Sequence, residues 1–383
     1  MDKPVKYLTK KGEIRYRINY SYKNSYGVTK RSSKGGFLTS KEAKAFARAQ
    51  EDSLESNVIR QDYKMSVQKL FEIWLETVRQ HVKETTFDFY KHMTKHFKYL
   101  YEMKIADITP QLLENYYYKL MEGNSEKQAI SASTIKHANT VIKIALEFAV
   151  KNDLLGRNVA KRVKLPNKKA YEYHWYNMDQ IAKLMKIIKG TYVEWPVKLA
   201  CCLGLRRGEV CALQWKDIDF DSRICYVYKN IVCISGRLVQ STPKTKYGFR
   251  KVPVSEILLK ELIAYKHEQR IMLSMKGMFQ TENTYICLNP RLEPANPDTI
   301  TRVFRSFLET KGAKYGLPVI RFHDLRHSFA SNMIYECGVP TELVSKILGH
   351  STSAFTVDTY GHASDNVQIN AIDKFDDRLR DLK

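Results

Sequence analysis

The segment RFHDLRHSFASN, residues 321–332, places two histidines and an arginine, His323, Arg326 and His327, within five residues. Histidines four residues apart on a helix can bind zinc, as in the metalloprotease pattern H-E-x-x-H. Here Asp324 stands where that pattern has glutamate, which shortens the reach of the base, and no third-ligand motif is evident nearby. We therefore expect no metal site and interpret His327 as a packed histidine beside a different kind of site.

Three further segments must be considered with it: GLRRGE (204–209), STPKTKYGFRKVPV (241–254) and LGHSTSAFTVDTYGH (348–362). Together the four segments resemble the tyrosine recombinase family, specifically the integrases of phages and conjugative transposons. In that family the order Arg, Lys, His-x-x-Arg, His, Tyr assembles one catalytic site. The chain has this order in Arg206, Lys244, His323, Arg326, His350 and Tyr360.

The resemblance implies phosphodiester substitution in DNA, and the residue types suit that chemistry. The reaction passes through a pentavalent state whose negative charge must be stabilised. Arg206 and Arg326 are permanent cations whose planar forks can bind non-bridging oxygens. By resemblance, His350 adds a further hydrogen bond and Glu209 orients the active-site arginine.

Tyr360 would supply the nucleophile. A tyrosine hydroxyl has a reference pKa of about 10, so attack near neutral pH needs a base or a cationic field. His323 is the base that the family suggests. The resulting 3′-phosphotyrosine conserves the bond energy, so the 5′ hydroxyl of another strand can reverse the attack without any metal, nucleotide or other cofactor.

Neighbouring residues compete for two of these roles. Arg207 stands directly beside Arg206. We expect Lys244, at a hairpin tip, to be the general acid that protonates the leaving 5′ oxygen. Lys246 is the competing assignment, and if it is not the acid we expect it to contact DNA. The sequence PKT favours Lys244.

The two residues nearest the carboxyl end are singled out by their context. His350 follows Gly349, which is expected to end a helix over TELVSKIL, so a cap or loop role is the alternative. Tyr360 lies ten residues after His350, where many family members have nine, and just before Gly-His. A tail helix is expected beyond it, from the spacing of Val367, Ala371, Phe375, Leu379 and Leu382, and it would pack on its own domain or, by resemblance, on a neighbouring protomer.

The composition favours a polyanionic partner. The chain of 383 residues has 63 Lys and Arg against 41 Asp and Glu, a net charge of +22. No apolar stretch approaches a membrane span and the start lacks the apolar core of a signal peptide, so we expect a cytoplasmic protein that does not bind membranes. The seven cysteines contain no C-x-x-C pair and are interpreted as buried thiols.

The first 64 residues are the most basic part of the chain for their length, with 15 basic and 7 acidic side chains. The alternation in GEIRYRINYSY predicts a strand with one basic face, and VTKRSS predicts a second strand, followed by Gly35 and Gly36. A turn is expected at 24–27, and the capping box Thr39-x-x-Glu42 predicts a helix over KEAKAFARAQ. This small sheet plus helix resembles the family's arm-type DNA-binding domain, with four expected DNA contacts: Arg15, Arg17, Lys30 and Arg31.

The rest of the chain predicts two further domains. Residues 65–165 contain four amphipathic helical runs, over 66–80, 85–103, 110–121 and 131–153, which predict a bundle matching the family's core-binding domain. Residues 166–174 are expected to form a basic linker. Residues 175–383 form the expected catalytic domain, mixed but mainly helical, with a strand over 224–234 paired across Ser235-Gly236 with RLVQSTP. The fold class is therefore multidomain and mostly α with small β-sheets.

We interpret the chain as a site-specific recombinase that integrates and excises a phage or other mobile genetic element, including integration of a viral genome. Its expected partners are double-stranded DNA at core-type and arm-type sites, three further copies in a homotetramer, an excision factor and a DNA-bending protein. One alternative is a type IB topoisomerase, which nicks and recloses DNA without exchanging partners. The other is a non-catalytic DNA-binding regulator.

Overall fold

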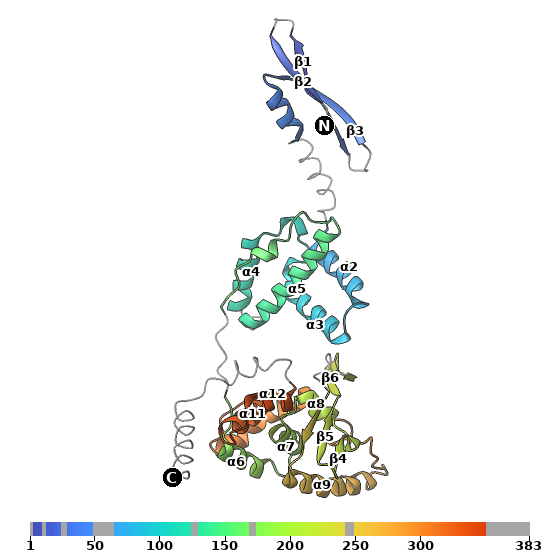
Figure 1. Cartoon of the computed structure of the whole chain (residues 1–383), viewed down its shortest axis with the longest axis vertical. Coiled ribbons are helices and arrows are strands. Elements are labelled where there is room, and N and C mark those ends of the chain that lie inside the picture. The colour runs from blue at the N-terminus through green and yellow to red at the C-terminus, as the bar shows by residue number, and fades with distance from the viewer. Residues whose placement is uncertain are drawn as a thin grey trace, which may run out of the picture. The chain divides into compact units, whose positions relative to one another are not determined.

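The computed structural model describes residues 3–9, 13–23, 29–48, 65–123, 129–167, 174–241 and 249–349. The chain divides into two compact units, Met1–Ala170 and Tyr171–Lys383. Figure 1 labels most of their helices and strands. The turn expected at 24–27 and the tail helix expected beyond Tyr360 lie outside the described residues.

The amino-terminal part of the first unit is a three-stranded antiparallel sheet, in the order β1 (Val5–Leu8), β2 (Ile14–Lys23), β3 (Thr29–Phe37). Buried Ile18 packs with Ala43 and Ala47 of a helical segment at 40–48. The strand predicted over VTKRSS continues through both glycines to Phe37, and β1 was not predicted. The predicted helix start is confirmed, because the Thr39 hydroxyl accepts from the Glu42 N–H at 3.1 Å.

The remainder of the first unit is a helical bundle around a core that includes Trp74, Phe97 and Tyr117. Its α-helices are α2 (Val67–Arg79), α3 (Glu84–Thr94), α4 (Pro110–Glu122) and α5 (Ala132–Lys151), and its 3-10 turns are η1 (Lys95–Leu100), η2 (Ile105–Asp107) and η3 (Val159–Arg162). The prediction of one helix over 85–103 is wrong, because α3 gives way to η1. The tighter turn puts Phe97 and Leu100, three residues apart, on one side, and both are buried.

The second unit combines short strands with helices around one large core. Its helices are α6 (Met178–Ile188), α7 (Glu194–Leu203), α8 (Arg207–Ala212), α9 (Glu256–Ser274), α10 (Pro297–Phe307), α11 (Asp324–Tyr335) and α12 (Thr341–Leu348), with the 3-10 turn η4 (Trp215–Asp217) and the π-helical turn η6 (Leu308–Gly312). One antiparallel sheet has the order β4 (Ile218–Asp219), β5 (Ile224–Val227), β8 (Arg250–Pro253), and a separate hairpin pairs β6 (Asn230–Ile234) with β7 (Arg237–Ser241).

The single strand predicted over 224–234 is wrong, because the chain leaves one sheet after Val227 and enters the hairpin at Asn230. The interruption contains Lys229, which is buried and pairs with Asp217 at 2.9 Å. A buried ammonium needs such a partner, and the partner lies in η4. The turn predicted at Ser235-Gly236 is confirmed, and both residues adopt positive φ, as a tight hairpin requires.

Two global expectations are checked by the structure. Across the part of the chain that it describes, no helix is both long and apolar enough to span a bilayer. All seven cysteines are free thiols, but the expectation that they are buried holds only in part, because Cys202 and Cys337 are exposed and Cys233 is partly so.

Candidate active site

Arg206 lies in the short connection between α7 and α8, at the residue that caps α8. Gly204 ends α7 with a positive φ of 62°. A Cβ at Gly204 would lie 2.6 Å from the Phe329 ring and 2.8 Å from the Leu348 side chain. Only glycine therefore fits where α7 meets α11 and α12, and this fixes where the Arg206 backbone begins.

The Arg206 side chain is held by Glu209, three residues later. Its Nη1 donates to Oε1 of Glu209 at 2.9 Å, and its backbone N–H donates to Oε2 at 2.8 Å. Its Nη2 reaches the backbone oxygen of Gly349 at 3.4 Å. The side chain remains 39% exposed, which leaves its outer edge accessible to a ligand.

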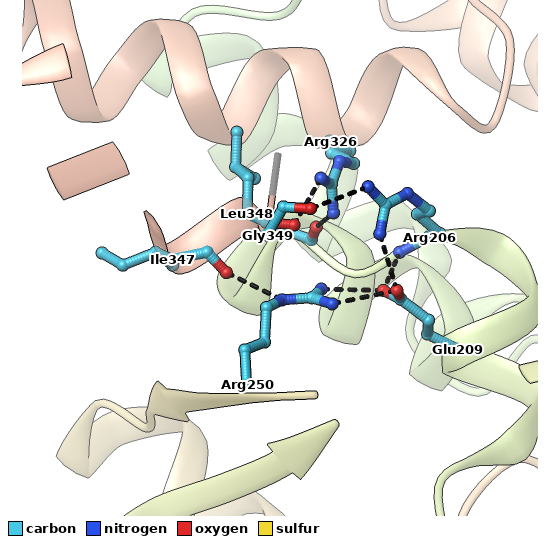
Figure 2. A network of polar contacts seen from close by, with 8 residues as sticks. Arg206, Glu209, Arg250, Arg326, Ile347, Leu348 and Gly349 are labelled. Carbon is cyan, nitrogen blue, oxygen red and sulfur yellow. Dashed lines mark hydrogen bonds and ion pairs between the residues drawn. The ribbon is translucent and has the colours of Figure 1, made fainter. Parts of the chain in front are cut away.

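Arg326 reaches the same region from α11 and is almost completely buried. Its Nη1 donates to the backbone oxygen of Gly204, and its Nη2 donates to that of Leu348, each at 2.6 Å. Arg206 and Arg326 thus bind the consecutive carbonyls of Gly349 and Leu348, and Figure 2 shows their guanidinium groups side by side. Two guanidinium groups so close together suit the binding of an anion.

His323 stands at the start of α11, before Asp324. Its side chain is exposed, but neighbouring atoms partly desolvate the ring. This desolvation, followed by the charges of Arg326 and Arg206, lowers the pKa of His323 below 6.5. The opposing charge of Asp324 does not compensate. His323 is therefore neutral at physiological pH, the form in which an imidazole can accept a proton.

His327 is buried one turn further along α11, with its ring centroid 5.1 Å from that of His323 and the planes at 87°. Burial, followed by the proximity of His323, lowers the pKa of His327 to about 4. The interpretation of His327 as a packed histidine beside the site agrees with its burial. Among the residues described, no three His, Cys, Asp or Glu side chains are arranged to hold a metal ion.

The structure distinguishes Arg206 from its neighbour. Arg207 points to α10, where its Nη1 donates to Asp298 at 2.9 Å and to Thr301 at 3.3 Å. Arg206, by contrast, faces Glu209 and Gly349. Of the two arginines, Arg206 is the one that shares a site with Arg326 and His323.

Lys244, Lys246, His350 and Tyr360 lie outside the described residues. The hairpin tip expected at Lys244 falls on the same residues and stays a prediction. Gly349, by contrast, ends α12 in the left-handed conformation, as predicted for the residue before His350.

A residue that the sequence interpretation did not select completes the network. Arg250 on β8 binds both carboxylate oxygens of Glu209, at 2.9 and 2.8 Å, and the backbone oxygen of Ile347 at 2.8 Å (Figure 2). Its signal was available in RKVPV, where Arg250 has the phase of buried Val252 and Val254. A cation at a core position of a strand requires a buried anion.

In the amino-terminal sheet, Arg15 and Arg17 lie on the face of β2 opposite to buried Ile18. The guanidinium of Arg17 lies over the ring of Tyr7 on β1, 5.1 Å from its centroid, and Arg15 pairs with Glu13 at 2.7 Å. Arg31 on β3 is exposed, while the side chain of Lys30 lies outside the described residues. Tyr7 was not among the predicted residues.

Family comparisons cover the three parts of the chain. Residues 174–367 match the Phage integrase family, residues 66–121 match the phage integrase N-terminal SAM-like domain, and residues 4–53 match the Arm DNA-binding domain. The first match alone spans half of the chain.

Comparisons with individual proteins indicate the same family. A XerC-like tyrosine recombinase of Caldanaerobacter subterraneus subsp. tengcongensis is 29% identical, with 80% of this chain and 82% of that protein covered. The ICEBs1 integrase of Bacillus subtilis is 28% identical, with 84% and 85% covered. The Tn1549 transposon integrase, solved in complex with transposon right end DNA, has the same fold, with a TM-score of 0.65 at 20% identity over 81% of this chain and 99% of that one. The chain belongs to the phage integrase family of tyrosine recombinases and is a site-specific recombinase of a mobile element.

Proposed function

We propose that the enzyme cuts and rejoins DNA through a 3′-phosphotyrosine formed by Tyr360. The scissile phosphate binds at the outer edge of Arg206 beside Arg326, and His323 accepts the phenol proton. Lys244 protonates the departing 5′ oxygen, and His350 donates a further hydrogen bond to the phosphate.

The observation that carries this proposal is the convergence of Arg206 and Arg326 on the last turn of α12. Arg206 lies more than a hundred residues before His323 and Arg326, and the two arginines bind Gly349 and Leu348, immediately before His350. Such a site stabilises charge on a phosphate without a metal ion because the guanidinium groups are preorganised before the substrate arrives. A neutral imidazole at its edge is ready to take a proton.

We further propose the division of labour among domains. Residues 1–64 bind arm-type sites, and residues 65–165 and 175–383 bind the core site. Residues 166–174 link the two core-binding parts. The basic outer face of β2 supports the first assignment, since Arg15 and Arg17 lie on it. Tethering a second DNA-binding module raises occupancy through effective concentration.

Recombination of two duplexes breaks four strands, and each Tyr360 attaches to one strand, so the active assembly is a homotetramer on DNA. An excision factor and a DNA-bending protein would set its direction. Because DNA is the substrate, the enzyme works in the cytoplasm at the nucleoid, and integration of a phage genome is one form of the reaction.

The test is a nicked suicide duplex carrying the core site of the element, on which a covalent adduct accumulates. Tyr360→Phe should bind the duplex and form no adduct, and peptide mapping of the native adduct should identify Tyr360. A persistent adduct in this variant would refute the assigned nucleophile. A two-site recombination assay separates a recombinase from a topoisomerase, and binding without any adduct would indicate a regulator.

A further inference from the structure

Arg250 is a buried cation that the proposed reaction does not use directly. Its side chain is 5% exposed, and Nη1, Nη2 and Nε all donate, the first two to Glu209 and the third to the backbone of Ile347. A guanidinium at this depth is stable only with such a complete set of partners. Figure 2 shows Arg250 and Arg206 reaching the Glu209 carboxylate from different directions.

The Glu209 carboxylate is shared between two arginines. Oε1 accepts from Arg250 Nη1 and Arg206 Nη1, and Oε2 accepts from Arg250 Nη2 and the backbone N–H of Arg206. Burial alone raises the pKa of Glu209, but the hydrogen bonds and charge of Arg250, together with the charges of Arg206 and Arg326, bring it to about 2. The carboxylate is therefore ionised at every pH at which the enzyme would work.

Because one Glu209 carboxylate is shared among several arginines, the network keeps a net positive charge. In the network of Figure 2, a single carboxylate faces the guanidinium groups of Arg206, Arg250 and Arg326. Because both oxygens of Glu209 are bound by Arg250, only Nη1 of the Arg206 fork binds the carboxylate. A carboxylate released by Arg250 could form a two-pronged pair with Arg206 and withdraw that guanidinium from a phosphate.

Arg250 also connects the carboxylate to α12. The Ile347 oxygen that it binds lies in the last turn of that helix, two residues before the Gly349 oxygen that binds Arg206. One buried side chain on β8 thus fixes the partner of Arg206 and the helix end that Arg206 contacts.

We propose that Arg250 is a positioning residue that holds Glu209 in the two-pronged geometry and thereby keeps the outer edge of Arg206 directed at the scissile phosphate. This role rests on the proposed function, in which Arg206 binds that phosphate.

The test compares two substrates with the full-length protein. One is the nicked core-site duplex, and the other is the same duplex with a neutral methylphosphonate at the scissile position. Arg250→Lys keeps a cation but lacks the planar fork that binds the two oxygens in parallel while Nε binds Ile347. It should cleave the phosphodiester roughly 10- to 100-fold more slowly than the native enzyme at unchanged DNA affinity. The methylphosphonate lacks the charge that Arg206 binds. On this substrate the ratio of native to Arg250→Lys cleavage rates should therefore be about tenfold smaller.

A matched control is Lys229→Met, which breaks another buried ion pair of the same unit, to Asp217. It should lower the unfolding temperature and change both cleavage rates by the same factor. Arg250→Met keeps the aliphatic stem and removes the charge. It should slow cleavage of the phosphodiester more than Arg250→Lys does, and its defect should again be smaller on the methylphosphonate. An equal defect of Arg250→Lys on both substrates, or no defect on either, would overturn the positioning role.

Arg206→Lys separates failure of this inference from failure of the proposed function. If methylphosphonate relieves the Arg206→Lys defect but not the Arg250→Lys defect, Arg206 binds the phosphate and Arg250 does not position it. If it relieves neither, the assignment of Arg206 to the phosphate is itself wrong.

Discussion

The guanidinium of Arg326 donates to the backbone oxygen of Gly204 at 2.6 Å, across 122 residues of sequence. This bond joins the end of α7 to α11, the helix that carries Arg326. From the end of α7 the chain passes directly to Arg206. The spacing of the two arginines is therefore set by one carbonyl, at a residue whose own conformation is restricted to glycine. Stability and the geometry of the candidate site are coupled at this point.

Gly204→Ala should consequently weaken both the fold and the cleavage rate. A non-glycine residue at positive φ costs about 1–2 kcal/mol. The new methyl group would also lie 2.6 Å from Phe329, an overpacking that costs about 1–3 kcal/mol more. We expect a lower unfolding temperature and slower adduct formation. Gly190→Ala is the control, since Gly190 also has positive φ but nothing within 4 Å of a new Cβ, and similar losses for both variants would contradict the packing explanation.

Local patterns predicted the elements whose stabilising contacts are close in sequence. The helix start expected at Thr39-x-x-Glu42 is confirmed, because the Thr39 hydroxyl accepts from the Glu42 N–H at 3.1 Å. The basic strand over GEIRYRINYSY is β2, because alternation alone separates its two faces. These signals need no knowledge of the rest of the fold.

Contacts that are distant in sequence account for what was missed. The alternating pattern runs unbroken through Lys229, but this side chain pairs with Asp217, twelve residues away, and the strand breaks there. Arg250 was not selected because its partners Glu209 and Ile347 lie 41 and 97 residues away. For the same reason, the choice between Arg206 and Arg207 required the positions of α10 and α12, which no local pattern supplies.

His327 makes the stability of the enzyme depend on pH. Its pKa is about 4 in the folded protein, below the ordinary 6.5 of histidine, so the unfolded chain binds the proton more readily. Folding stability contributed at this position is present above pH 6.5 and is lost as the pH falls toward 4. The difference in unfolding temperature between the native enzyme and His327→Gln should therefore shrink between pH 7.5 and pH 5. The same substitution at exposed His267 controls for removal of an imidazole, and a difference that grows in acid would exclude a neutral buried His327.

Lys244 and Lys246 can be distinguished through the leaving group. A 5′-thiolate departs without protonation, so a substrate with sulfur in place of the bridging 5′ oxygen does not need the general acid. Lys244→Ala should lose roughly 100-fold or more in cleavage of ordinary DNA and recover on the thio substrate. Lys246→Ala should show a much smaller loss and no selective recovery. The opposite result would move the acid role to Lys246.

Arg17 and Lys34 provide a matched pair for the amino-terminal sheet. Arg17 lies over Tyr7 on the open face, whereas Lys34 lies opposite buried Ile18, on the helix-covered face, with its ammonium 4.2 Å from the Phe46 ring centroid. If the open face binds DNA, Arg17→Ala should weaken arm-site affinity and reduce the slope of log affinity against log salt by about 1. Lys34→Ala should change neither, and both variants should cleave the isolated core site at the native rate. Loss of core-site cleavage in Arg17→Ala, or an equal loss of arm-site affinity in Lys34→Ala, would contradict the assignment of this face to arm-site DNA.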